Sequence, residues 1–272
     1  MSSVQTMKDA VRRALGERDG VAVHLFDTVD STNTEAKRKS ATERGTALYI
    51  ARTQTGGRGR LGREFHSPAD TGLYMTLAYT TSLPLSASVH TTALAAVAAV
   101  SAIQALTAKR PCIKWVNDLY LGGAKVAGIL TEAVTLPDGQ TRMLVGIGIN
   151  LTTTSFPDGL RAPATALFTP DEATALPLDF SGTLAGEIAR RLLMLAETDT
   201  LPDGRSCLDF YRRHLLYVGE RVTCTQGDNT FEGTVLGVND AYGLVVEIPA
   251  GGVAVLDAGE ISVRPVTPPA AR

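Results

Sequence analysis

The stretch IKWVNDLYLGGAKVAGILTEAVTLPDGQTRMLVGIGINL, residues 113–151, decides the fold class of this chain. It holds short apolar runs separated by Gly, Asn and Asp turn signals, at 113–116, 119–121, 126–134 and 143–151. This pattern predicts short strands that form one sheet. The predicted helices gather mainly before and after this stretch, so an α+β fold fits better than a regular βαβ alternation.

The spacing of apolar residues predicts further helices and strands on both sides of this stretch. We expect helices at 7–15, 31–40, 87–106, 184–195 and 207–216, and upstream strands at 21–26, 46–53 and 73–79. After Gly219, short runs joined by Gly-rich and Asn-Asp turns predict a small antiparallel barrel. Its strands are expected at 221–226, 230–238, 243–249 and 252–257. The chain therefore divides into a larger domain at 1–217 and a barrel at 218–272.

The composition is that of an ordinary globular chain. Lys and Arg number 26 against 28 Asp and Glu, so the net charge of −2 creates no global basic field toward nucleic acid or a membrane. The three cysteines are far apart and lack metal-ligand spacing with the histidines, so we expect reduced thiols in the cytosol and no metal site. Ser, Thr, His and Gln interrupt the run 87–106, which favours a buried core helix over a membrane span.

The segment QTGGRGRLGREFHSP, residues 54–68, contains four glycines and three arginines. It formally matches the dinucleotide pattern G-x-G-x-x-G, but Pro68 and a strand follow instead of a helix, and no acid occurs between Asp70 and Asp118. Glycines let backbone N–H groups turn toward an anion, and guanidinium groups bind phosphate or carboxylate oxygens in pairs. The segment therefore predicts a loop for an anionic ligand, with a solvated basic loop as the alternative.

A second segment, Lys114-Trp115-Val116-Asn117-Asp118, is followed by Lys125 across a Gly-Gly turn. This spacing places Asp118 and Lys125 on adjacent strands of a hairpin, where both side chains can face one cleft. Taken alone, Lys125 is more often a solvated hairpin residue. The apolar residues on both sides make an exposed edge less favoured.

Five segments, in this order, make the chain resemble the biotin protein ligases, most strongly over residues 24–151. The resemblance implies a mixed central sheet with flanking helices, similar to class II synthetases, and a small C-terminal SH3-like β-barrel. Phe65 stands where the family usually has Trp, and Val116 where it has Pro. The segments are Asp30–Asn33, Gln54 with Gly57–Arg63, Lys114–Asp118, Lys125–Leu130 and Gly146–Leu151.

The resemblance implies a two-step reaction, in which the biotin carboxylate attacks the α-phosphate of ATP and a carrier lysine then attacks biotinyl-AMP. Magnesium is expected to travel on the ATP phosphates. Lys125, Arg60 and Asp118 are the implied catalytic residues, with Asp118 either accepting a proton or positioning a cation. The implied biotin-binding residues are Ser31, Thr32, Asn33, Gln54, Arg58, Gly59, Arg60 and Lys125, and the ATP-binding residues are Arg60, Arg63, Asn117, Lys125 and Asn150.

The resemblance also implies a partner protein and two alternative functions. The implied partner is a biotin carboxyl carrier protein or domain, and the oligomeric state stays open, a homodimer included. A lipoate or octanoate ligase has a similar architecture, but its substrates lack the ureido ring that Ser31, Thr32 and Asn33 suit. Some family members carry a DNA-binding domain before the ligase, but only 20 residues precede Val21 here, so we expect neither DNA binding nor a membrane partner.

Overall fold

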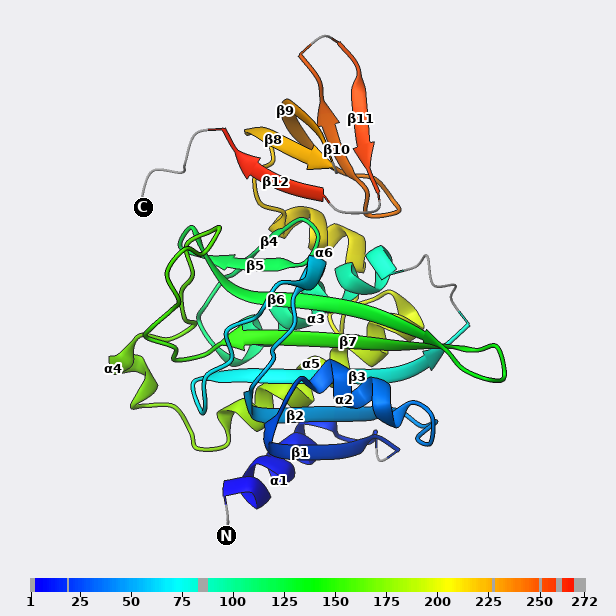
Figure 1. The fold of residues 1–272 in the computed structure, drawn as a ribbon, viewed down its shortest axis with the longest axis vertical. Helices are drawn as coiled ribbons and strands as arrows, with labels where there is room; N and C mark the ends of the chain where they lie inside the picture. Colours follow the sequence, from blue (N-terminus) through cyan, green and yellow to red (C-terminus); the bar gives the residue numbers. More distant parts are fainter. Residues whose placement is uncertain are drawn as a thin grey trace.

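The structure, a computed structural model, describes residues 3–18, 20–82, 88–226, 228–249, 251–257 and 261–266. Figure 1 shows a large sheet with helices on its faces and a smaller sheet beside one edge of it. The described part of the chain thus forms two sheets, which meet around the helix α6 (Cys207–His214).

The large sheet is mixed, as the sequence predicts. Its strand order is β1-β2-β3-β7-β6-β5-β4. Only β1 and β2 are parallel among these neighbours, and every other neighbouring pair is antiparallel. The strands are β1 (Ala22–Val29), β2 (Ala47–Gln54), β3 (Gly72–Thr81), β4 (Cys112–Lys114), β5 (Asp118–Leu121), β6 (Ala124–Thr135) and β7 (Thr141–Asn150).

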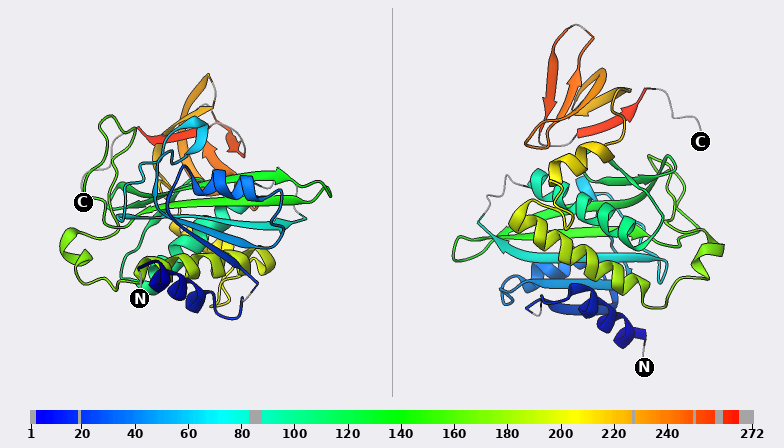
Figure 2. Two further views of the ribbon diagram at one scale, coloured as in Figure 1. Left: turned by 60° about the horizontal axis from the view of Figure 1, so that its bottom comes forward. Right: turned by 180° about the vertical axis from the view of Figure 1, so that it is seen from behind.

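The two faces of the large sheet have different coverings because successive side chains of a strand point to opposite faces. Viewed nearly along the sheet in Figure 2, α1 and α5 lie on one face and α2 lies on the other. On β7, Val145, Ile147 and Ile149 belong to the core, whereas Gly146 and Gly148 alternate with them. The helices are α1 (Ser3–Leu15), α2 (Thr32–Lys39), α3 (Ser88–Leu106), α4 (Pro170–Ala173) and α5 (Phe180–Thr198), in addition to α6.

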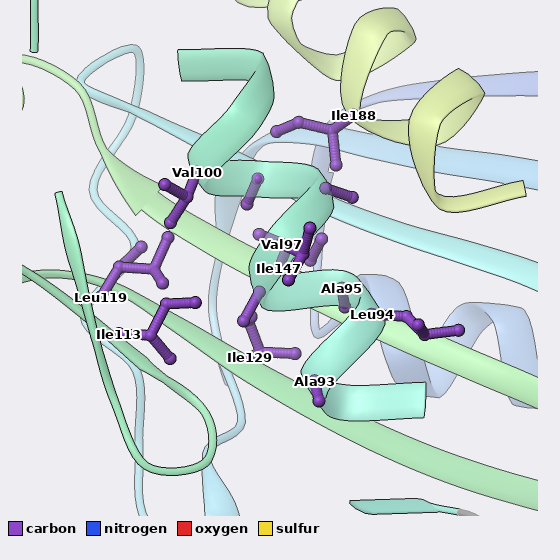
Figure 3. Close-up of a cluster of buried hydrophobic side chains, with 14 of the residues drawn as sticks. Ala93, Leu94, Ala95, Val97, Val100, Ile113, Leu119, Ile129, Ile147 and Ile188 are labelled. Atoms are coloured by element: carbon purple, nitrogen blue, oxygen red, sulfur yellow. The ribbon is translucent and has the colours of Figure 1, made fainter. Parts of the chain in front are cut away.

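Helix α3 fills the core between the sheet and α5. Figure 3 shows Val97 beside Ile147 and Ile129 of the sheet and Val100 beside Leu119, with Ile188 of α5 next to another part of the helix. By length and composition α3 could cross a membrane, but 72% of its most apolar window is buried inside the molecule. This burial confirms the prediction of a core helix for 88–106, and residue 87 lies outside the described part.

The C-terminal sheet is antiparallel, with the order β11-β10-β9-β8-β12. The four predicted strands are present, and β12, a short strand that ends at a proline, is an addition that the sequence analysis missed. A closed barrel is not confirmed, because β11 and β12 are the two edges and do not pair within the described residues. The strands are β8 (Arg221–Gln226), β9 (Asn229–Val238), β10 (Leu244–Glu247), β11 (Val253–Leu256) and β12 (Ile261–Pro265).

Helix α1 packs closely on α5 because two glycines of α5 leave room for it. A Cβ atom at Gly186 would lie 2.5 Å from the carbonyl oxygen of Val11 and 2.7 Å from Ala14 Cβ, and one at Gly182 would lie 2.7 Å from the Met7 carbonyl. Contacts below 3 Å to backbone atoms require the helices to separate. The absence of these side chains is what lets α1 lie against the core.

We expect Gly186→Val to lower the free energy of unfolding by about 2 kcal/mol, because the added methyl groups overpack the helix contact. The measurement is chemical unfolding followed by circular dichroism. Thr183→Val, on the same helix, is the matched control, since it brings an equally β-branched residue without the backbone clash. Equal stability of the two variants would contradict the packing argument.

Candidate functional site

A cavity of about 410 Å³ lies on the α2 face of the large sheet, between the sheet and the loops that cover it. Its floor includes Gly128 of β6 and Gly146 and Gly148 of β7. A Cβ at Gly148 would lie 2.6 Å from the ring of Phe65, so the loop aromatic rests where a side chain would otherwise stand. The glycines therefore give a flat floor on which a ligand and an aromatic ring can both lie.

One end of the cavity is polar and uncharged, and it is formed by the start of α2. Ser31 occupies the N-cap position, but its side chain makes no capping hydrogen bond, and it is buried against the cavity. Thr32 donates from its backbone N–H to Gln54 Oε1 at 2.9 Å, and its hydroxyl lies 3.2 Å from the same oxygen. The Ser31 hydroxyl thus lies at the cavity, and the Thr32 hydroxyl lies there too, between Gln54 and Thr76, whose Oγ1 is 2.8 Å away.

Asn33, the third predicted residue here, is held by the protein. Its amide nitrogen donates to the Leu130 carbonyl at 3.2 Å and to Glu132 Oε2 at 2.9 Å, and its amide oxygen accepts from Thr76 at 2.6 Å. Sequence reasoning missed Thr76 and Glu132, because each lies inside a strand with no motif around it. Asn33 therefore joins α2 to β3 and β6 below the polar end of the cavity.

The Gly-Arg loop, residues 54–67, folds back on itself beside this polar end. The backbone N–H of Gly59 donates to the Arg63 carbonyl at 2.8 Å, and that of Phe65 donates to the Gly57 carbonyl at 2.9 Å. Gln54, at the end of β2, closes the loop by donating to Ser67 Oγ at 3.0 Å. The predicted anion-binding side chains on this loop, Arg58, Arg60 and Arg63, all line the cavity, as does Gly59.

The other end of the cavity carries charge. Lys125 Nζ lies 2.6 Å from Asp118 Oδ1, so the predicted pair does meet across the hairpin. A β-bulge opposite Leu119 and Tyr120 shifts the pairing of β5 with β6, and it brings Lys125 to the same face of the sheet as Gly128. A Cβ atom at Gly128 would lie 3.1 Å from the ammonium nitrogen of Lys125. The lysine is therefore directed over the floor rather than into solvent.

Lys114 adds a further cation to this end. Burial lowers the pKa of its ammonium, and the nearby positive charges of Lys125, Arg264 and Arg63 lower it further, while Asp118 opposes them. Positive charges that lie this close to the Lys114 ammonium favour an anionic ligand, because the ligand relieves their repulsion. This end of the cavity is suited to phosphate groups.

Two predicted asparagines position other groups at this end. Asn117 accepts from Arg60 Nη1 at 3.1 Å and donates to the Ile129 carbonyl at 3.0 Å, so it links the Gly-Arg loop to β6. Asn150 donates to the Thr165 carbonyl at 3.1 Å. Both line the cavity, but the contacts that the structure shows for their amide nitrogens are to backbone oxygens.

Further cavity residues come from parts of the chain that the sequence analysis did not assign. The segment 163–165 pairs with the backbone of Lys125, and it brings Phe156 and Arg161 to the rim. Arg264 reaches the rim from β12, the strand that was not predicted. Neither segment matches a motif, so only the fold assembles them with the rest.

Trp115 joins the cavity wall to the C-terminal sheet. Its indole Nε1 donates to the Tyr242 carbonyl at 2.7 Å. The Tyr242 side chain is 2% exposed and packs edge-on against His90 and Tyr211 from helices α3 and α6. The turn before β10 thus holds the segment that carries Lys114, Asn117 and Asp118.

The cavity combines a neutral polar end, an apolar aromatic middle and a cationic end. Such a site fits two ligands that meet at their anionic groups, one of which has a neutral polar head. Bringing two anions together requires cations that are already in place, since their mutual repulsion otherwise opposes the encounter.

Comparisons with known proteins agree on one family. The sequence profile of the Biotin/lipoate A/B protein ligase family matches residues 25–150. The biotin–(acetyl-CoA-carboxylase) ligase of Paracoccus denitrificans is 33% identical over 236 residues, which cover 84% of this chain and 95% of that protein. The bifunctional ligase/repressor BirA of Bacillus spizizenii is 32% identical over 233 residues, which cover 84% of this chain and 69% of that protein.

A solved structure matches the fold as well. The biotin protein ligase from Aquifex aeolicus, in complex with biotin and ATP, superposes with a TM-score of 0.68 at 26% identity. The match covers 90% of this chain and 99% of that one, so it includes both sheets.

We expect Trp115→Phe to lower the free energy of unfolding by about 1–3 kcal/mol, because the buried Tyr242 carbonyl loses its donor. Urea unfolding followed by far-ultraviolet circular dichroism measures the change, since Trp115 is the single tryptophan and its fluorescence is lost in the variant. An unchanged free energy would mean that this hydrogen bond does not help to join the two sheets.

Proposed function

This chain belongs to the biotin protein ligase family, and we propose that it activates biotin with ATP and transfers the biotinyl group to a lysine of a carrier domain. The observation that carries the proposal is that one cavity has both a hydroxyl-lined end and a cationic end. The first end suits the ureido ring of biotin, and the second suits the biotin carboxylate and the phosphates of MgATP.

The first half-reaction joins the two ligands at the cationic end. A carboxylate oxygen of biotin attacks the α-phosphorus of ATP, and the bond to the bridging oxygen of pyrophosphate breaks. Arg60 and Arg63 bind the phosphates, and Asn117 and Asn150 lie beside the nucleotide. Ser31, Thr32 and Asn33 bind the ring, while Gln54, Arg58 and Gly59 close over it.

Lys125 stabilises the charge that develops as the two anions react. The ion pair with Asp118 at 2.6 Å supports this role, because it holds the ammonium over the cavity floor. Asp118 therefore positions a cation in the first step. In the second step it can accept the proton that the attacking carrier lysine releases.

The acceptor is a biotin carboxyl carrier domain, and the name of the Paracoccus denitrificans relative supports acetyl-CoA carboxylase as its enzyme. A lipoate ligase is not favoured, since the polar end offers hydroxyl groups to a ring that lipoate lacks. We propose that the reaction takes place in the cytosol, and the three free cysteines support this location.

Exchange of labelled pyrophosphate into ATP tests the proposal. We expect exchange that depends on biotin and is not supported by lipoate or octanoate. Lys125→Ala should slow the biotin-dependent exchange at least about a hundredfold, because it removes roughly 3–4 kcal/mol of transition-state stabilisation. Lys39→Ala, which removes an exposed lysine of α2, is the matched control.

Wild-type protein that exchanges pyrophosphate without biotin, or not at all, would overturn the proposed function. Exchange by Lys125→Ala at the wild-type rate would instead leave the function standing and remove Lys125 from its catalytic role.

Arg60→Gly should release biotinyl-AMP prematurely. Loss of charge-assisted hydrogen bonds to the phosphate would raise the escape rate of the intermediate by about ten- to a hundredfold. Free biotinyl-AMP acylates exposed lysines, so incubation with biotin, ATP and albumin should biotinylate the albumin, as a streptavidin blot detects. No excess labelling, from a variant that still releases pyrophosphate and beside an Arg110→Gly control, would show that Arg60 does not retain the intermediate.

A further inference from the structure

The neighbours of Asn33 determine which way its amide is turned. Two oxygens face the amide nitrogen, the Leu130 carbonyl at 3.2 Å and the Glu132 carboxylate at 2.9 Å. Neither oxygen carries a hydrogen, so only the N–H bonds of the amide can face them. Asn33 is 3% exposed, and its amide oxygen must therefore face Thr76.

The direction of the next hydrogen bond follows from this orientation. Thr76 Oγ1 lies 2.6 Å from Asn33 Oδ1 and 2.8 Å from Thr32 Oγ1, and Thr76 is completely buried. An amide oxygen has no hydrogen to give, so Thr76 donates its only hydroxyl hydrogen to Asn33. Any hydrogen between the two threonine hydroxyls must then come from Thr32.

A second chain of hydrogen bonds, through Ser67 and Gln54, also ends at the Thr32 hydroxyl with an oxygen that can only accept a hydrogen bond. Ser67 Oγ donates to the Phe65 carbonyl at 2.8 Å, so it accepts from Gln54 Nε2 at 3.0 Å. The amide oxygen of Gln54 is thereby turned toward Thr32, and the backbone N–H of Thr32 donates to it at 2.9 Å. This oxygen also has no hydrogen to offer the Thr32 hydroxyl, which lies 3.2 Å away.

Both protein neighbours of the Thr32 hydroxyl can therefore only accept its hydrogen. We infer that Thr32 presents a lone pair to the cavity, and that Glu132 and Thr76 are positioning residues that set this direction. Resting on the proposed function, the inference makes the polar end selective for a ligand that donates an N–H bond. Glu132 is effective because a hydrogen bond to a carboxylate is stronger than one between neutral groups.

The ureido ring of biotin supplies N–H donors of this kind. The dithiolane ring of lipoate and the alkyl end of octanoate supply none, so each would leave the buried acceptor without a partner. Selectivity thus originates partly in Glu132 and Thr76, which act through Asn33 and Thr32 and do not touch the ring.

The test compares paired variants in the pyrophosphate-exchange assay of the full chain, with biotin and ATP varied separately. Thr76→Val and Glu132→Leu should raise the KM for biotin by about tenfold, the effect of losing one buried hydrogen bond, and leave the KM for ATP within about twofold. Thr76→Ser and Glu132→Gln restore a hydroxyl or an acceptor oxygen, so their KM for biotin should stay within about threefold of wild type.

Desthiobiotin, which keeps the ureido ring but lacks the sulfur, provides a second readout. Its KM should rise in parallel with that of biotin in Thr76→Val and Glu132→Leu. Glu17→Leu, which removes an exposed acid after α1, is the control for loss of one negative charge and should change neither KM.

The outcomes separate the inference from the proposed function. Wild-type protein without biotin-dependent exchange would overturn the proposed function. If the wild type is active, three results would overturn the inference. The KM for biotin could be unchanged in Thr76→Val and Glu132→Leu, or the KM for ATP could rise as much as that for biotin. The third such result is a KM for biotin in Thr76→Ser and Glu132→Gln that is raised as much as in Thr76→Val and Glu132→Leu. If Thr76→Val does not fold in a thermal unfolding assay, the Glu132 pair carries the test alone.

Discussion

The asymmetry between the two faces of β7 is the constraint on which the rest of the structure depends. Val145, Ile147 and Ile149 point to the helix side and bind the sheet to α3, whereas Gly146 and Gly148 leave the opposite side without side chains. Apolar burial on one face stabilises the sheet. The opposite face, where the glycines leave room for Asn33 and Phe65, then provides the floor, so the strands that build the core also build the cavity.

One end of this floor is polar and uncharged and the other is cationic, and a different local structure produces each. At one end, the start of α2 presents hydroxyl groups whose hydrogen bonds are directed by buried partners. At the other, a β-bulge brings Lys125 over the floor beside Asp118. Because both devices are anchored in strands, the distance between the polar and cationic ends is set by the sheet and not by a loop.

The sequence predicts the architecture well wherever a residue acts through its own strand or motif. The apolar runs between 113 and 151 predict the central strands, and the spacing of Asp118 and Lys125 across a Gly-Gly turn predicts their meeting. Thr76 and Glu132 could not be found this way, because their importance arises from contacts with α2 that only the folded chain makes. Arg264 was missed with its strand, whose few residues end in a proline.

The contribution of β12 to the cavity has a consequence for the order of events during synthesis. Ser31 emerges early from the ribosome and Arg264 very late, although both line the same cavity. The hydrogen bond from Trp115 to Tyr242 likewise awaits the C-terminal sheet. A nascent chain can therefore assemble the large sheet while its ligand pocket still lacks a wall. The part of the cavity lining that Val263 and Arg264 supply is added only after β12 has been translated.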